Sequence, residues 1–242
     1  MVLRDRIPKL EPAGGDVYGE TAGPHPEHDA RPGHAAPSPA LRLAILGDSS
    51  AAGFGAPDHA TALAGQMAEA LAALSGRAVS WRVTARGGAT ARTAPLTLLP
   101  GLTDPATGWR PELVLVVVGV NDTTRLRRPA LFHRDVSRLI SAIRDHLGEP
   151  IPVLLAGLPP VHRFPALPAP VRFLLGRHAR RLDRRLGALA RQLPDTYHLP
   201  VGQLPMDRPG LFAPDGFHPA PAAYRVWGRL LAAQAADVLE TA

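Results

Sequence analysis

Short apolar runs alternate with amphipathic segments along most of this chain, and this alternation restricts the fold more than any other feature of the sequence. The runs are short and rich in β-branched residues, as buried strands of a parallel sheet are. The predicted strands cover residues 41–46, 79–85, 113–118, 151–156 and 197–201. Strands that alternate with helices predict a three-layer α/β/α domain with about five mostly parallel strands.

The segments between these runs carry apolar residues every three or four positions, which is the period of a helix with one buried face. The predicted helices cover residues 58–74, 132–147, 175–193 and 224–238, and a short helix follows Gly88. Residues 1–39 lack this pattern and are rich in Pro, Gly, Asp, Glu and His. We therefore expect a disordered or loosely attached arm over 1–39 and a single domain over 40–242.

The composition excludes several kinds of chemistry. The chain has no cysteine, which rules out disulfides, thiolate nucleophiles and cysteine-ligated metal sites. Lys9 is the only lysine, so the predicted domain has no lysine for a phosphate-binding loop or a Schiff base. The formal charge of +6 comes almost entirely from arginine, and no nucleic-acid-binding module accompanies it.

The sequence also bears on location. Arg4, Arg6 and Lys9 are not followed by the apolar stretch of a secretory signal. The strongly apolar run 113–120 is far too short to span a membrane. We expect a cytoplasmic protein with no stable membrane insertion and no nucleic-acid partner.

Polar clusters follow the predicted strands. They are Gly47-Asp48-Ser49-Ser50, Arg86-Gly87-Gly88-Ala89-Thr90, Gly119-Val120-Asn121-Asp122 and Asp215-Gly216-Phe217-His218-Pro219. The carboxyl ends of parallel strands meet at one edge of a sheet, where ligands bind. We therefore expect these clusters to lie together.

Together the clusters contain what acyl transfer requires. A serine becomes a nucleophile when a histidine takes its proton, and the histidine needs an anion that fixes its tautomer. An aspartate three residues before a histidine can fold back onto it. Backbone amides at glycine turns and an asparagine amide can stabilise an oxyanion.

At these residues the sequence resembles the SGNH hydrolases, also called GDSL esterases or lipases. Their four signature blocks correspond here to Gly47-Asp48-Ser49, Gly88, Gly119-Val120-Asn121-Asp122 and Asp215-Gly216-Phe217-His218. The resemblance spans roughly residues 41–239 and implies the flavodoxin-like SGNH hydrolase fold. The GxSxG motif of the α/β-hydrolases is absent around Ser49.

The resemblance implies a role for each site residue. Ser49 is the expected nucleophile, and His218 is the expected general base, oriented by Asp215. The expected oxyanion hole combines the Ser49 amide, the Gly88 amide and the Asn121 side chain.

Three points stay open at the site. The family's usual leucine after the serine is Ser50 here. Gly87 competes with Gly88 as the amide donor, and Asp122 is the rival of Asp215 as the triad acid.

The resemblance implies a serine-dependent carboxylic-ester hydrolase that acts on small esters, with short acyl chains favoured because no lid domain is visible. We expect neither a cofactor nor a metal. The same residues serve carbohydrate or other O-deacetylases, thioesterases and lysophospholipases, and sequence alone does not separate these activities. A non-catalytic flavodoxin-like binding module is the rival from another class. The oligomeric state is not predicted.

Two further segments allow two interpretations each. The predicted helix over 175–193 and the residues just before it are rich in arginine, which fits a solvated face. Alternatively, these arginines attract anionic lipid or a phosphate-bearing substrate, which would give weak association with a membrane surface. The proline-rich segment 158–170 is either a plain connection or a rim on which Phe164 and Leu167 line an acyl pocket.

Overall fold

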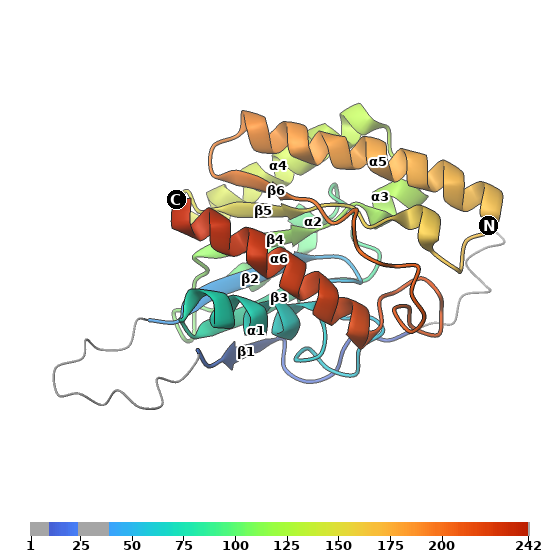
Figure 1. Cartoon of the computed structure of the whole chain (residues 1–242). Coiled ribbons are helices and arrows are strands. Elements are labelled where there is room, and N and C mark those ends of the chain that lie inside the picture. The colour runs from blue at the N-terminus through green and yellow to red at the C-terminus, as the bar shows by residue number, and fades with distance from the viewer. Residues whose placement is uncertain (1–9, 24–38, 242) are drawn as a thin grey trace, which may run out of the picture.

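A computed structural model of the chain describes residues 10–23 and 39–241. At its centre these residues form a six-stranded sheet in the order β1-β3-β2-β4-β5-β6 (Figure 1). The strands are β1 (Tyr18–Thr21), β2 (Leu41–Gly47), β3 (Val79–Ala85), β4 (Leu113–Val117), β5 (Val153–Ala156) and β6 (Thr196–Leu199). The helices are α1 (Leu63–Ser75), α2 (Ala94–Thr97), α3 (Val120–Thr124), α4 (Pro129–Leu147), α5 (Ala169–Gln192) and α6 (Pro221–Thr241), with the 3₁₀ helices η2 (Leu99–Leu102) and η3 (Val161–Arg163).

The strands β2 to β6 are parallel, and helices cover both faces of the sheet. On one face α1 and α6 pack together over a core that includes Leu43, Met67 and Trp227. On the other face α4 and α5 enclose a second core around Val116 and Phe132. Figure 1 shows α1 and α6 in front of the sheet and α5 along its upper side. This arrangement confirms the predicted three-layer, mostly parallel α/β/α fold.

The central strand β4 is buried along its whole length. Its leucine and valine side chains pack against helices on both faces of the sheet. This explains why the strand lacks the alternation of apolar and polar residues that a half-exposed strand has. The last predicted strand is also present, although it runs over Thr196–Leu199 rather than to residue 201.

The sheet contains one strand more than expected, and it comes from the predicted arm. β1 pairs antiparallel with β3, and the Val83 amide donates to the Val17 carbonyl at 2.7 Å. The Ala13 amide also donates to the Ala52 carbonyl at 2.9 Å. Residues 10–23 therefore lie on the domain, held mainly by backbone hydrogen bonds. An edge strand that buries little apolar surface leaves no apolar pattern, so the sequence did not reveal it.

The rest of the predicted arm, residues 1–9 and 24–38, lies outside the described residues. The division of the chain at residues 39 and 40 stays a prediction.

All four long helices begin at residues other than the periodicity predicts; α4 and α6 begin three residues earlier, and for α1 and α5 the reason is local. The predicted helix start at Asp58 is a turn, because the Asp58 carboxylate accepts hydrogen bonds from the Thr61 amide and hydroxyl, both at 2.8 Å. The helix proper begins at Leu63. By contrast, α5 begins earlier than expected, at Ala169, with Pro170 in its first turn, where the missing amide hydrogen costs nothing.

Across residues 10–23 and 39–241, the helices are either too short or too polar to cross a bilayer.

Candidate active site

The sheet brings the polar clusters to one edge, as the alternation of strands predicts. Gly47 at the end of β2 pairs with Ala85 on one side and Val117 on the other. Beyond the strands, the Asp48 amide donates to the Val117 carbonyl at 3.0 Å, and the Arg86 amide donates to the Gly47 carbonyl at 3.1 Å. The chain segments that follow the three strands are therefore fixed side by side.

Ser49, His218 and Asp215 form one hydrogen-bonded chain. His218 Nε2 lies 2.9 Å from Ser49 Oγ, and His218 Nδ1 lies 2.5 Å from Asp215 Oδ2. The Asp215 side chain has no exposed surface, whereas the His218 side chain is 16% exposed. Because the carboxylate can only accept, the Nδ1 nitrogen carries the proton and Nε2 is free to accept the Ser49 hydroxyl proton.

A compact loop holds the acid and the histidine. The Ala213 amide donates to the His218 carbonyl at 2.9 Å, and the Gly216 amide donates to the Ala213 carbonyl at 2.9 Å. Asp215 Oδ1 accepts the amides of Phe217 and His218, each at 2.9 Å. Gly216 has a φ of +64°, a conformation that suits glycine. The spacing of three residues therefore lets one carboxylate fix both its own loop and the imidazole.

The glycine turn after β3 contains both candidates for the second oxyanion-hole amide, Gly87 and Gly88. The Ala89 amide donates to the Arg86 carbonyl at 3.0 Å, which closes a four-residue turn, and Gly88 occupies the third position with a φ of +80°. A turn of this kind requires glycine at that position. Among the described residues, the amides of Ser49, Gly87 and Gly88 all lack a protein acceptor, so the hydrogen bonds leave the choice between Gly87 and Gly88 open.

Asn121 joins the first three clusters. Its Nδ2 donates to the Ala89 carbonyl at 3.0 Å and lies at a longer 3.4 Å from Asp48 Oδ2. Gly119, two residues before Asn121, has a φ of +125°, and a Cβ atom there would lie 3.0 Å from the Leu158 side chain. The turn that aims Asn121 toward the glycine turn therefore depends on a residue without a side chain.

Two buried carboxyl groups support the loops. Burial raises the pKa of the Asp48 carboxyl from 3.8 to about 7, although Asp48 accepts the Ser50 amide at 2.9 Å. Burial also raises the pKa of Asp122, which accepts the Ala91 amide at 3.1 Å. Asp122 thus holds the chain beyond the glycine turn, and the carboxylate hydrogen-bonded to His218 is that of Asp215.

Sequence reasoning missed Phe54 and Gly55, which position the histidine from the other side. The Phe54 ring lies 5.2 Å from the His218 ring, and the Phe54 carbonyl accepts the Tyr224 hydroxyl at 2.8 Å. Gly55 has a φ of +92°, and a Cβ atom there would lie 2.3 Å from the Pro219 carbonyl oxygen. None of the four sequence motifs includes Phe54 or Gly55. The one signal in the sequence is that both residues follow Ser49 closely.

A small apolar pocket opens beside the serine, with a cavity volume of about 20 Å³. Its lining joins Ser49, Ser50 and His218 to Val120, Pro159, Phe164, Leu204, Met206, Phe217, Pro219, Ala223 and Trp227. The Ala166 amide donates to the Gly216 carbonyl at 3.0 Å, which ties the proline-rich segment to the histidine loop. Phe164 lines the pocket, whereas Leu167 packs in the core behind it.

The described part of the chain contains no group of three histidine, aspartate or glutamate side chains placed to hold a metal ion. The groups gathered at the site are instead a hydroxyl, an imidazole, a carboxylate and amide donors, the set that acyl transfer uses.

The sequence and the structure were compared with known proteins. The sequence profile of the GDSL-like lipase/acylhydrolase family matches residues 45–226. No curated protein matches the chain.

Among solved structures, a lipase from a goat rumen metagenome has a TM-score of 0.60 at 19% identity, over 81% of this chain and 97% of its own. The protein TesA has a TM-score of 0.59 at 25% identity, over 81% of this chain and 97% of its own. A family 3 carbohydrate esterase from Clostridium thermocellum has a TM-score of 0.62 at 16% identity, over 84% of this chain and 98% of its own.

Proposed function

The chain belongs to the GDSL-like lipase/acylhydrolase family, and on that premise we propose that it hydrolyses carboxylic esters of short acyl chains through an acyl-serine intermediate. The observation that carries the proposal is the hydrogen-bonded chain from Asp215 through His218 to Ser49. It connects a buried anion, a base and a hydroxyl in the order that general-base catalysis requires.

The first half-reaction forms the acyl-enzyme. His218 Nε2 takes the Ser49 proton as Oγ attacks the ester carbonyl carbon, and Asp215 stabilises the imidazolium that results. The tetrahedral intermediate collapses as the C–O bond to the alcohol breaks, and His218 donates its proton to the departing alcohol. In the second half-reaction His218 Nε2 takes a proton from a water molecule as the water oxygen attacks the acyl carbon. The bond from that carbon to Ser49 Oγ then breaks, His218 returns the proton to Oγ, and the acid is released.

The oxyanion that develops needs donors that are already in place. The amides of Ser49 and Gly88 have no other acceptor among the described residues, which makes both available. Asn121 Nδ2 has two hydrogens, of which one is held by the Ala89 carbonyl at 3.0 Å. The other faces Asp48 only at 3.4 Å, a weak contact that an oxyanion can replace.

The pocket beside Ser49 supports the preference for short acyl chains. A cavity of about 20 Å³ has room for one or two water-sized groups, the scale of an acetyl group. The aromatic side chains of Phe164 and Phe217, whose rings are 5.2 Å apart, are among the lining residues and narrow the space beside the serine. Because the space beside the serine is on the scale of an acetyl group, an O-deacetylase acting on a carbohydrate or another alcohol is the second candidate.

The test compares hydrolysis of p-nitrophenyl esters, from acetate to decanoate, by the wild type, Ser49→Ala and Asn121→Ala. We expect turnover to be highest on the shortest esters. Ser49→Ala should lower the rate of ester hydrolysis by roughly 10⁴–10⁶-fold. Asn121→Ala should lower it by about 10²–10³-fold, because it removes an oxyanion donor.

A fluorophosphonate probe separates catalysis from a binding module, because it labels only an activated serine. Ser50→Ala is the matched control, since Ser50 is the neighbouring hydroxyl in the same pocket. Labelling of the wild type and Ser50→Ala but not Ser49→Ala supports the proposal. Equal labelling of Ser49→Ala, or no labelling of any form together with no ester turnover, would overturn it.

A further inference from the structure

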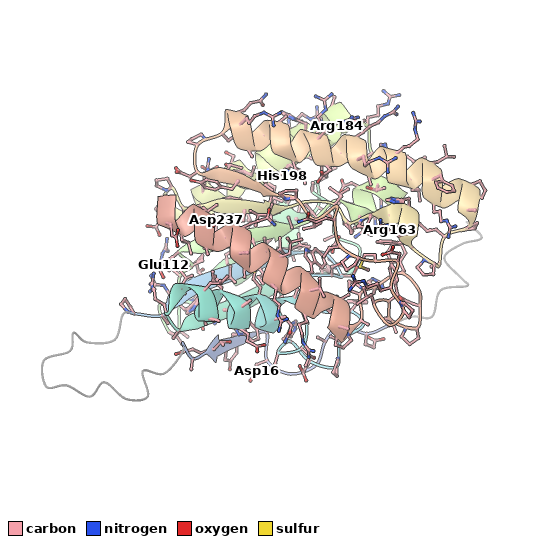
Figure 2. All side chains as sticks on the ribbon, in the orientation of Figure 1. Asp16, Glu112, Arg163, Arg184, His198 and Asp237 are labelled. Atoms are coloured by element: carbon pink, nitrogen blue, oxygen red, sulfur yellow. The ribbon has the colours of Figure 1, made fainter. Side chains whose placement is uncertain are left out.

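The outer face of α5 carries arginines that have no acidic partner. The side chains are exposed, and none forms an ion pair or a side-chain hydrogen bond within residues 10–23 and 39–241. They are Arg177, Arg180, Arg181, Arg184, Arg185 and Arg191, here called the α5 arginine face. Figure 2 shows Arg184 on this helix, directed away from the sheet.

The helix geometry concentrates this charge. The positions are separated by three, one, three, one and six residues, which keeps all of them on one side of a helix with 3.6 residues per turn. Arg177, Arg180, Arg181 and Arg184 line one surface hollow. Like charges so close together repel unless an anion lies among them.

The acidic residue of α5 does not relieve this repulsion. Asp183 Oδ1 accepts the Leu158 amide at 2.9 Å and lies 3.0 Å from His198 Nε2. Its carboxylate is thus directed toward the sheet, and the outer face of the helix remains uncompensated. A surface of this kind attracts an extended anion.

Two large apolar side chains continue the same face. Phe173 is 58% exposed and Leu174 is 68% exposed. They precede Arg177 by four and three residues, so they lie one turn away on the same side of the helix. α5 follows β5 and packs on η3, so its first turns lie at the edge of the sheet where the histidine loop is anchored.

We propose that this face, formed by Phe173, Leu174 and the α5 arginine face, docks on the surface of an anionic lipid bilayer. Guanidinium groups pair with lipid phosphates, and the two apolar side chains enter the interface. The apolar pair argues for lipid and against nucleic acid, since an exposed leucine gains nothing from a phosphate backbone. The buried face of α5, with Leu182 and Leu186, stays in the core.

The surface is independent of the proposed hydrolysis, so the experiment measures binding alone. Vesicles of phosphatidylcholine, with or without about 30% phosphatidylglycerol, are incubated with the full chain and sedimented. The Ser49→Ala protein is used so that lipid turnover does not affect the result. We expect binding only to the anionic vesicles, and we expect about 0.5 M salt to abolish it.

Charge reversal tests the arginine face. The triple variant Arg180→Glu, Arg181→Glu, Arg184→Glu should weaken vesicle binding by at least about tenfold. The matched control is Arg138→Glu, Arg208→Glu, Arg229→Glu, which changes the net charge equally at exposed positions on other elements. The control should keep more of the binding than the α5 variant does.

Substitution of Phe173 and Leu174 distinguishes binding to a lipid surface from binding to polyanions in general. Phe173→Ser with Leu174→Ser should weaken vesicle binding severalfold and leave retention on duplex DNA unchanged. The proposal is overturned if the wild type ignores anionic vesicles at low salt, or if the two charge-reversal variants bind equally. It is also overturned if the apolar variant binds vesicles as well as the wild type, which would indicate a general polyanion surface.

Discussion

At the scale of single residues, the Asp215 carboxyl group has two roles, one in orienting His218 and one in holding the loop. One oxygen accepts a hydrogen bond from the His218 Nδ1–H, and the other accepts hydrogen bonds from the amides of Phe217 and His218. The first contact orients the imidazole, and the second closes the loop that carries it. Substitutions that remove one contact at a time separate these two roles.

Asp215→Asn should lower kcat by roughly 10⁴ with little loss of stability. The amide oxygen can still accept the two backbone amides, but its nitrogen would donate to Nδ1. This would place the proton on Nε2, which then could not accept from Ser49. Asp215→Ala should lose as much activity and also about 1–3 kcal/mol of stability, because two buried amides lose their acceptor. Ester hydrolysis and urea unfolding of both variants test this, and equal stability of the two would contradict it.

At the scale of elements, the site depends on how closely two loops approach each other. The serine loop follows β2 and carries Ser49, and the histidine loop precedes α6 and carries His218. Gly55 belongs to the first and faces the backbone of Pro219 in the second. The isolated pairing of Phe212 with Pro219 keeps the histidine loop closed on its other side. Backbone contact thus fixes the two loops against each other, in addition to the contact between the Phe54 and His218 rings.

Gly55→Ala should lower kcat/KM by about tenfold to a hundredfold, since its Cβ atom would displace the segment next to His218. The matched control is Gly108→Ala, because Gly108 also has a positive φ, +69°, but has open space around it. Both variants place alanine at a positive φ, and only Gly55→Ala adds the collision. Kinetics on p-nitrophenyl acetate and the Tm of each variant provide the comparison. Similar activity of the two variants would exclude the positioning role.

Three segments of the candidate site were predictable because each is a polar cluster directly after an apolar strand. The rule that parallel strands end at one edge brings Ser49, Gly88 and Asn121 together. His218 lies on a longer loop after β6, and the resemblance of its DxxH block, rather than its distance from a strand, pointed to it. The approach of Gly55 to Pro219 was not predictable, because it depends on the distance between two loops that are far apart in the sequence. β1 was missed for a related reason, since its backbone hydrogen bonds leave no mark on the side-chain pattern.

At the scale of the whole molecule, Asp48 links the site to the pH dependence of stability. Burial raises its pKa from 3.8 to about 7, so the folded protein binds a proton there that the unfolded chain has already released. The contribution of Asp48 to the free energy of unfolding therefore falls as pH rises through this interval. The stability that the neutral carboxyl contributes is complete below pH 3.8 and is lost as pH approaches 7.

Asp48→Asn should flatten this slope, because the amide does not titrate. The stability of the variant relative to the wild type should rise between about pH 4 and pH 7, by about 1.4 kcal/mol for each unit of pKa shift. Asp122, whose pKa burial also raises, is present in both proteins. Urea unfolding at several pH values measures the difference, and parallel stability curves would show that Asp48 titrates normally.

The distance in sequence between Ser49 and His218 has a consequence for synthesis on the ribosome. The two residues that share a hydrogen bond are 169 positions apart, and α6, which packs on α1, comes later still. At about 5–20 residues per second, on the order of ten seconds or more separates the synthesis of Ser49 from that of His218. On the proposed mechanism the nascent chain carries a serine with no base during that interval, so ester hydrolysis cannot begin before the segment that contains His218 has been made.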